Sequence, residues 1–169
     1  MGKIAWCVTG GGHLLKECVA LLERADNLEL YPTPAGLEIM DMYKLKPSVK
    51  TVTDPTASTV TCRGFATGEY DLLVVAPATS NGVAKFVCGI SDSMVTTLFA
   101  QCGKSRVPII VLPTDVEENV DSMGLTKPIK VYPRPIDLKN IEELAKFEGV
   151  TVVKTIQELE NSIGPYTNL

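Results

Sequence analysis

Two segments of the chain are apolar at almost every position, which is the pattern of strands covered on both faces. They are Tyr70–Ala76 (YDLLVVA) and Val107–Pro113 (VPIIVLP). A strand with one face in solvent would alternate apolar and polar residues, so these segments predict parallel strands between two layers of helices. Shorter apolar segments at Lys3–Thr9, Leu28–Thr33 and Val150–Lys154 predict three further strands.

Segments with helical spacing of apolar residues alternate with these strands. The expected helices are Leu14–Arg24, Ala35–Tyr43, Val83–Cys102, Leu138–Phe147 and Ile156–Ile163. Gly89–Ser93 interrupts the pattern of the third. Alternating strands and helices predict βαβ units, and therefore an α/β fold with a doubly wound parallel sheet. At 169 residues, the chain is expected to form a single domain, residues 1–169.

Three regions have no clear periodicity. Pro47–Gly68 is rich in Thr, Val and Pro, and we expect a short strand, a loop and a turn there. Its length suits a flap over a ligand. Two prolines exclude Lys130–Asp137 from the centre of a sheet. The last residues, GPYTNL, are expected to be frayed.

Composition and charge exclude several classes of protein. The net charge is −4, without a cluster of Lys and Arg among aromatic residues, so nucleic acid is not expected as a partner. No segment has the roughly 18 apolar residues of a membrane span, and no signal peptide is expected. The five cysteines are widely spaced without a metal-binding pattern, which favours a reduced cytoplasmic protein with most of them buried. The single histidine, His13, excludes a metal site with several histidines.

Ligands of doubly wound sheets bind beyond the carboxyl ends of the strands. This rule selects four loops, Gly10–His13, Pro32–Ala35, Pro77–Gly82 and Pro113–Asp115. The glycines of the first loop let a ligand approach the backbone, and the helix that follows offers free N–H groups to an anion. A tight turn without a ligand explains the same residues, since neither a dinucleotide fingerprint nor a P-loop is present. For Thr33 in the second loop, helix capping is an equal alternative to ligand contact.

The third loop has the residues that a flat ligand needs. Ala78, Thr79 and Ser80 are small enough for close approach to the backbone, and Asn81 offers a neutral donor and acceptor. Asp92 follows in an apolar context and is expected to have a partner, either as a helix cap or as a contact with a neighbouring subunit.

Residues 77–94 resemble a known flavoprotein motif. Pro77–Lys85 (PATSNGVAK) and Gly89–Met94 (GISDSM) are similar to the PASANT region of the homo-oligomeric flavin-containing cysteine decarboxylase superfamily. The resemblance covers residues 1 to about 125 and implies a flavodoxin-like Rossmann fold with bound FMN. It also implies a homo-oligomer built from trimers, with the flavin at a subunit boundary.

Three further segments are similar to the archaeoflavoprotein and dihydromethanopterin reductase branch. They are GGHLLKE at 11–17, PRPIDL at 133–138 and LAKFEGV at 144–150. The resemblance implies that reduced FMN passes a hydride to dihydromethanopterin or a similar dihydropterin. Electrons would come from NAD(P)H or from a ferredoxin-type donor. Two alternatives stay open, a flavin-dependent decarboxylase or prenyltransferase and an electron-transfer flavoprotein that accepts electrons from ferredoxin.

The resemblance and the loop positions together predict the site residues. Those expected to bind FMN are Gly10, Gly11, Gly12, His13, Thr33, Ala35, Pro77, Ala78, Thr79, Ser80, Asn81, Ser91 and Asp92. Those expected to bind the substrate are Pro113, Thr114 and Asp115. No catalytic residue is assigned, although Asp115 and Glu117 are candidates for a substrate-side acid by position. For the electron-transfer alternative, the residues that would face an acidic ferredoxin are Lys3, Lys16, Lys44, Lys46 and Lys50.

Overall fold

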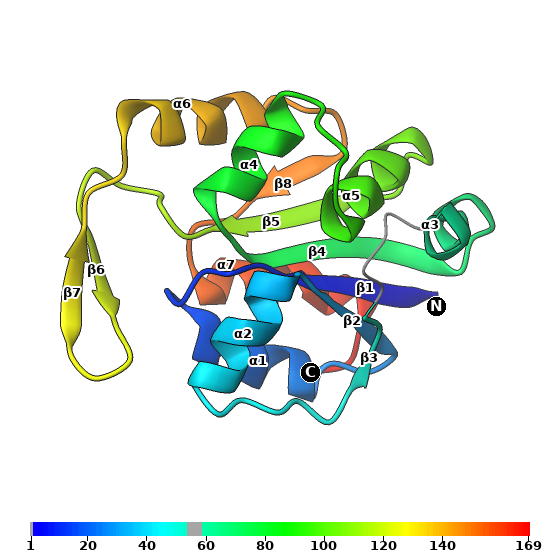
Figure 1. Ribbon diagram of the computed structural model, residues 1–169. Coiled ribbons are helices and arrows are strands. Elements are labelled where there is room, and N and C mark those ends of the chain that lie inside the picture. Colours follow the sequence, from blue (N-terminus) through cyan, green and yellow to red (C-terminus); the bar gives the residue numbers. More distant parts are fainter. Residues whose placement is uncertain (1, 54–58) are drawn as a thin grey trace.

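Six parallel strands form the central sheet of the computed structural model, which describes residues 2–53 and 59–169 (Figure 1). In spatial order they are β3 (Lys50–Thr51), β2 (Leu28–Pro32), β1 (Lys3–Val8), β4 (Tyr70–Ala78), β5 (Ile109–Pro113) and β8 (Val150–Val152). Every neighbouring pair in this sheet is parallel. This order is typical of doubly wound Rossmann-type sheets, so the predicted α/β fold class is confirmed.

Helices cover both faces of the sheet. The helices on one face are α1 (Leu15–Arg24), α2 (Pro34–Met42) and α7 (Ile156–Ile163). Those on the other face are α3 (Thr59–Ala66), α4 (Ser80–Val87), α5 (Met94–Lys104) and α6 (Pro135–Leu144). Figure 1 shows α1 and α2 below the sheet and α4, α5 and α6 above it.

Successive residues of each strand enter different cores, because side chains of a strand alternate between its faces. On β4, Leu72 and Val74 pack in the core with α1 and α7, whereas Leu73 and Val75 pack in the core with α5. The only tryptophan, Trp6, is fully buried on β1. Its indole N–H donates a 2.8 Å hydrogen bond to the carbonyl of Ala76, which satisfies the polar end of the ring.

The expected single helix Val83–Cys102 is two helices, α4 and α5. Gly89 has a φ of 68°, a backbone conformation that suits glycine and ends the helical path. Ser93 then caps α5, and its side chain accepts a hydrogen bond from the backbone N–H of Thr96. Helix α5 carries little charge because Val95, Leu98 and neighbouring side chains are buried in the core of this same chain.

Helix α3 occupies part of the Pro47–Gly68 segment, where no helix was expected. Phe65 of α3 is buried, and its ring lies 5.1 Å from that of Tyr70. The helix also packs against α5. This tertiary packing outweighs the preference of the Thr- and Val-rich sequence for extended structure. The flap that was expected in this segment falls partly on residues 54–58, which lie outside the described residues.

A two-stranded antiparallel ribbon projects from the sheet between β5 and α6 (Figure 1). Its strands are β6 (Val120–Met123) and β7 (Pro128–Val131). The prediction that Lys130–Asp137 lies outside the central sheet is confirmed, because β7 pairs only with β6 and Pro135 begins α6. A proline at the first position of a helix needs no N–H partner.

The carboxyl-terminal residues are ordered against the body, so the expectation of fraying was wrong. A short 3₁₀ helix spans Gly164–Tyr166, and Thr167 is buried. The Thr167 hydroxyl accepts a 2.7 Å hydrogen bond from the backbone N–H of Asp26 and donates to the Asp26 carbonyl at 3.1 Å. These two bonds fix the end of the chain beside the turn that follows α1.

Glu29 is a buried carboxylate that joins four strands near the amino edge of the sheet. It accepts hydrogen bonds from Lys3 (2.9 Å) on β1, Lys50 (2.7 Å) on β3, Tyr31 (2.9 Å) on β2 and Tyr70 (2.5 Å) on β4. Burial alone would raise the pKa of Glu29, but the four donors outweigh burial and lower this pKa from 4.5 to about 2. Lys3 and Lys50 are therefore held by this carboxylate, which weakens the idea of a lysine surface for ferredoxin.

Four of the five cysteines are buried, as expected, and Cys88 is exposed. Burial raises the pKa of the Cys102 thiol to about 12, which makes it a poor nucleophile. Within residues 2–53 and 59–169, no group of three metal-ligating side chains comes together. None of the helices in these ranges has both the length and the apolar character needed to cross a bilayer.

Candidate functional site

The four loops selected from the sequence lie at the carboxyl edge of the sheet. They follow β1, β2, β4 and β5, which are neighbours in the strand order. The order in which strands are added to the sheet reverses between β1 and β4. Strands β2 and β3 lie on one side of β1, and β4, β5 and β8 lie on the other. Crevices at such a switch point are the usual ligand sites of open α/β sheets.

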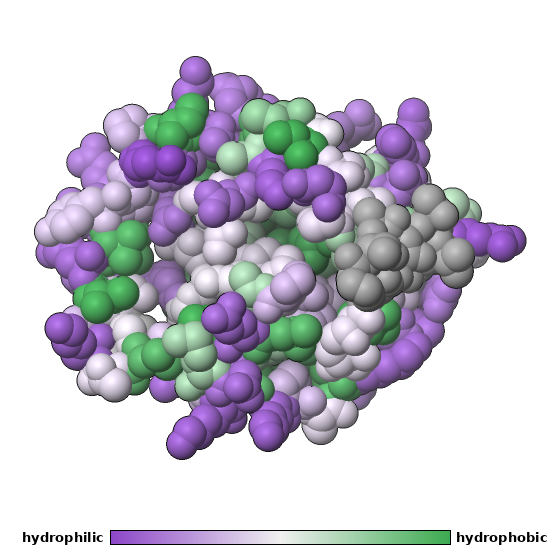
Figure 2. Space-filling view, viewed as in Figure 1, coloured by the Kyte–Doolittle hydropathy of each residue, from purple (hydrophilic) through white to green (hydrophobic). Residues whose placement is uncertain are grey.

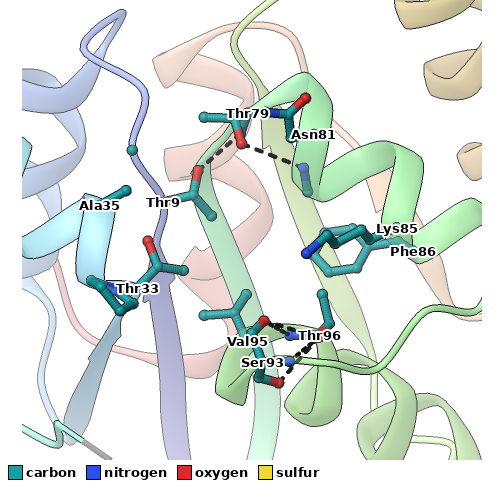
Figure 3. A pocket seen from close by; sticks show the side chains of 13 residues that line it. Thr9, Thr33, Ala35, Thr79, Asn81, Lys85, Phe86, Ser93, Val95 and Thr96 are labelled. Atoms are coloured by element: carbon teal, nitrogen blue, oxygen red, sulfur yellow. Dashed lines mark hydrogen bonds between the residues drawn. The ribbon is translucent and has the colours of Figure 1, made fainter. Parts of the chain in front are cut away.

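A cavity of about 440 Å³, here called the main cavity, opens between these loops. Its lining residues are Thr9, Gly10, Thr33, Pro34, Ala35, Thr79, Asn81, Gly82, Lys85, Phe86, Ser93, Val95 and Thr96. Figure 3 shows how the side chains from the loops after β1, β2 and β4 and from the start of α5 surround it. On the molecular surface the same face is hollowed, with neutral and apolar residues inside and hydrophilic residues around it (Figure 2).

Three helices begin at the main cavity, and each is capped by one of its own side chains. The hydroxyl of Thr33 accepts from Gly36 N–H at 2.9 Å at the start of α2, and Thr79 and Ser93 cap α4 and α5. The capping role considered for Thr33 is thus present in the structure, and Thr33 lines the cavity as well. Helix N-termini carry partial positive charge, so the cavity favours anionic groups.

Thr9 connects the loops on the two sides of the switch point. Its buried hydroxyl donates to the carbonyl of Pro77 at 2.8 Å and accepts from the N–H of Thr79 at 2.9 Å. Sequence reasoning did not place Thr9 in the site, although its position at the end of the first strand, next to the glycines, was an available indication. The two bonds hold Thr79, which lines the cavity, against the loop after β1.

Phe86 provides an apolar wall that was also missed. Its ring stacks on Phe99 with centroids 4.1 Å apart and an interplanar angle of 11°. Because Phe99 belongs to α5 and Phe86 to α4, this stack sets the spacing of the two helices beside the cavity.

Asp92 pairs with Lys85 across the α4–α5 connection, so neither expected partner, a helix end or another subunit, is needed. The Lys85 ammonium lies 2.9 Å and 2.7 Å from the two carboxylate oxygens. The hydrogen bond from Lys85 lowers the pKa of the Asp92 carboxyl, which keeps it ionised. The cap of α5 is Ser93. Ser91, also expected at the flavin, donates its hydroxyl to Thr97 at 3.0 Å and does not line the main cavity.

A second cavity of about 350 Å³ lies on the other side of the glycine loop, next to the β6–β7 ribbon. Its lining residues are Gly11, Gly12, His13, Ile39, Tyr43, Thr114, Asp115, Ser122, Gly124, Leu125, Ile129 and Val131. The structure therefore brings Gly11, Gly12 and His13 together with Thr114 and Asp115, while Gly10 lines the main cavity.

The partition between the two cavities is closely packed. A β-carbon on Gly11 would come 2.7 Å from the Thr114 methyl group and 3.4 Å from that of Thr79, so a side chain does not fit there. Ser80 hydrogen-bonds to Asp115 and links the start of α4 to the loop after β5. Of the other predicted residues, Pro77, Ala78 and Pro113 are buried at strand ends, and the candidate acid Glu117 is exposed and lines neither cavity.

A family model described as Flavoprotein matches residues 2–167 of the chain. The chain is also similar to the dihydromethanopterin reductase (acceptor) of Methanocaldococcus jannaschii. The two are 35% identical over 180 residues, which cover 95% of this chain and 70% of the relative.

Solved structures are similar over nearly the whole chain. The structure of DmrB from Burkholderia xenovorans in complex with FMN, described as a cubic protein cage for redox transfer, matches with a TM-score of 0.88 and 35% identity. That match covers 97% of this chain and 94% of DmrB. A dodecameric FMN-dependent UbiX-like decarboxylase from Escherichia coli O157:H7 matches with a TM-score of 0.69 and 16% identity, over 90% of this chain and 79% of that one. At that identity the similarity concerns the fold alone.

Proposed function

The chain belongs to the Flavoprotein family, and from this membership we propose that it is an FMN-dependent reductase of dihydromethanopterin or a similar dihydropterin. The product is the tetrahydro form. The observation that supports the proposal most is the main cavity at the switch point, where small neutral residues, an aromatic wall and three helix N-termini meet.

The residues of the main cavity fit FMN. A β-carbon on Gly10 would come 2.8 Å from that of Ala35, so a side chain larger than hydrogen is excluded where the loops after β1 and β2 meet. Small neutral residues, one aromatic wall and three helix N-termini suit a flat ring with a phosphate. When bound, FMN supplies the hydride-transfer chemistry. Thr33 and Asn81 would hold the cofactor, and Phe86 and Val95 would exclude water from it.

The reacting ring of the pterin would lie against the flavin, and we propose that its polar end is held in the second cavity. Asp115 lines it with an orientation fixed by Ser80, and a carboxylate can accept hydrogen bonds from the amino group and the ring N–H of a pterin. The reduction also needs a proton, and His13, Tyr43 and Asp115 are the titratable side chains among the lining residues. Thr114 also lines this cavity, and its methyl group packs against Gly11.

An anaerobic assay tests the proposed activity. Protein loaded with FMN, dihydromethanopterin and an excess of NADPH or reduced ferredoxin are mixed, and loss of the dihydropterin absorbance is followed. We expect turnover with dihydromethanopterin. The rate with dihydrofolate is measured in the same way, and the ratio of the two rates shows which class of pterin the enzyme prefers. Rapid flavin reduction by ferredoxin without any loss of dihydropterin would contradict the proposal and favour the electron-transfer alternative.

We also propose a homo-oligomer built from trimers and a cytoplasmic location. The cage described for DmrB supports the oligomer. Five free cysteines suit a reducing compartment. The ferredoxin-binding alternative has less support, since Lys3 and Lys50 are already paired with Glu29.

Asn81→Ala is expected to lower the affinity for FMN about tenfold, or by about 1.4 kcal/mol. The side chain lines the main cavity and offers both a donor and an acceptor, which alanine removes. Titration of the apoprotein with FMN, followed by flavin fluorescence, measures the change. Asn161→Ala removes a similar side chain from the exposed face of α7 and is the matched control. Unchanged FMN affinity and activity in Asn81→Ala would contradict the placement of this loop at the flavin.

A further inference from the structure

Among the described residues that line the main cavity, Lys85 is the only charged one. It projects from the last turn of α4, and Figure 3 shows its ammonium nitrogen directed into the cavity. The side chain is 40% exposed, so the ammonium lies at the boundary between the cavity and solvent. Within residues 2–53 and 59–169, every other lining side chain is neutral, and no carboxylate is among them.

Asp92 holds this ammonium in place from outside the cavity. Both carboxylate oxygens bind Lys85, at 2.9 Å and 2.7 Å, and Asp92 is not a lining residue. The cation therefore lies on the cavity side of the pair and the anion on the solvent side, where 52% of the Asp92 side chain is exposed. Water screens the exposed carboxylate more strongly than the ammonium at the cavity.

The starts of α2, α4 and α5 add to the positive charge that Lys85 brings to the main cavity. Their N-termini meet at the main cavity, and each contributes a partial positive charge. The cavity thus presents a net positive surface to its ligand. In the described part of the chain, Lys85 supplies the only full charge in that surface.

We propose that Lys85 sets the redox potential of the bound flavin by favouring its reduced form. The inference rests on the proposed function, in which the main cavity holds FMN. The oxidised ring system is neutral and the reduced one is anionic at neutral pH, while the phosphate carries the same charge in both. A cation beside the ring system therefore strengthens binding of the reduced form relative to the oxidised form, and the potential rises.

Lys85→Met tests the inference with the midpoint potential of the FMN-loaded protein, measured by titration against reference dyes. Methionine keeps much of the apolar stem and removes the charge. We expect the affinity for reduced FMN relative to oxidised FMN to fall about tenfold, which lowers a two-electron potential by about 30 mV. Lys85→Arg keeps the charge and is expected to restore most of the potential.

Asp92→Asn supplies a second test with the opposite sign. It removes the counter-charge of Lys85, so the potential is expected to rise rather than fall. A purely structural role for the pair, joining the end of α4 to the start of α5, would affect both variants alike. Lys146→Met is the matched control, because Lys146 pairs with Glu143 on the surface of α6 and lines neither cavity.

Three results would overturn the inference. One is a Lys85→Met potential equal to that of the wild type. Another is a shift of the same sign in Lys85→Met and Asp92→Asn. The third is a potential that stays unchanged while the preference for FMN over riboflavin is lost, since Lys85 would then hold the phosphate. A wild-type protein that binds no flavin would instead contradict the proposed function itself.

Discussion

Gly36→Ala is expected to lower the affinity for FMN about a hundredfold, or by about 3 kcal/mol. Gly36 lies in the first turn of α2, and a methyl group there would overlap the backbone carbonyl oxygen of Val8. That oxygen also accepts the N–H of Thr33 at 2.9 Å, so the start of α2 cannot move away without breaking this bond. The same turn supplies Pro34 and Ala35 to the main cavity, whose shape must therefore change.

Overpacking at Gly36 is also expected to lower the free energy of unfolding, by about 1–3 kcal/mol. Flavin titration and urea unfolding of the apoprotein measure the two effects separately. Gly103→Ala is the control, because Gly103 lies inside α5 and a β-carbon there meets no atom within 4 Å. Equal FMN affinity in Gly36→Ala and Gly103→Ala would show that the start of α2 is not part of the flavin site.

Glu29→Gln is expected to lower the free energy of unfolding by about 3 kcal/mol at pH 7. This is the free energy that corresponds to lowering the pKa of Glu29 from 4.5 to about 2. The pKa of Glu29 is lower in the folded protein than in the unfolded chain. Its contribution to stability is therefore complete above pH 4.5 and is lost as the pH falls toward 2. The gap between wild type and Glu29→Gln should narrow over that range in urea unfolding curves.

Glu143→Gln is the control for this experiment. Glu143 also pairs with a lysine, Lys146, but on the exposed surface of α6, where ion pairs contribute little. A gap between wild type and Glu29→Gln that stays constant from pH 7 to pH 2 would mean that the carboxylate charge is not what stabilises the four strands.

The strands and the family could be predicted from the sequence because each is indicated by a short, continuous stretch of residues. Continuous apolar character marks β4 and β5, and both are covered by helices on two faces. The superfamily resemblance of residues 77–94 agrees with the Flavoprotein match over residues 2–167. The helix Ile156–Ile163 was predicted with its observed bounds.

The elements that were missed depend on contacts between distant parts of the chain. Helix α3 forms from residues with extended preference because Phe65 packs on Tyr70 and the helix packs on α5. The β6–β7 ribbon pairs two short strands, and β7 is mostly exposed without a pattern of burial. Thr167 is ordered by Asp26, which is 141 positions away in sequence. Local periodicity contains no information on such contacts.

The same distinction applies to the site. The alternation of strands and helices placed the four loops at one edge of a parallel sheet, so Thr33, Thr79 and Asn81 could be expected at the same edge. The start of α5 could not, because it returns to the cavity only after Gly89 ends α4 and the chain turns back. Lys85 was noticed in the sequence as a residue one turn into the helix, but its pairing with Asp92 depends on that turn.

The position of Trp6 gives the protein a built-in optical probe. As the chain's single tryptophan, on the strand that ends at Val8, it emits from one defined and fully buried place. Flavins absorb in the range where buried tryptophan emits, so energy transfer from Trp6 would dim this emission in proportion to occupancy. Unfolding would move the same emission to longer wavelength as water reaches the indole. One spectrum can therefore separate loss of cofactor from loss of fold in every variant described above.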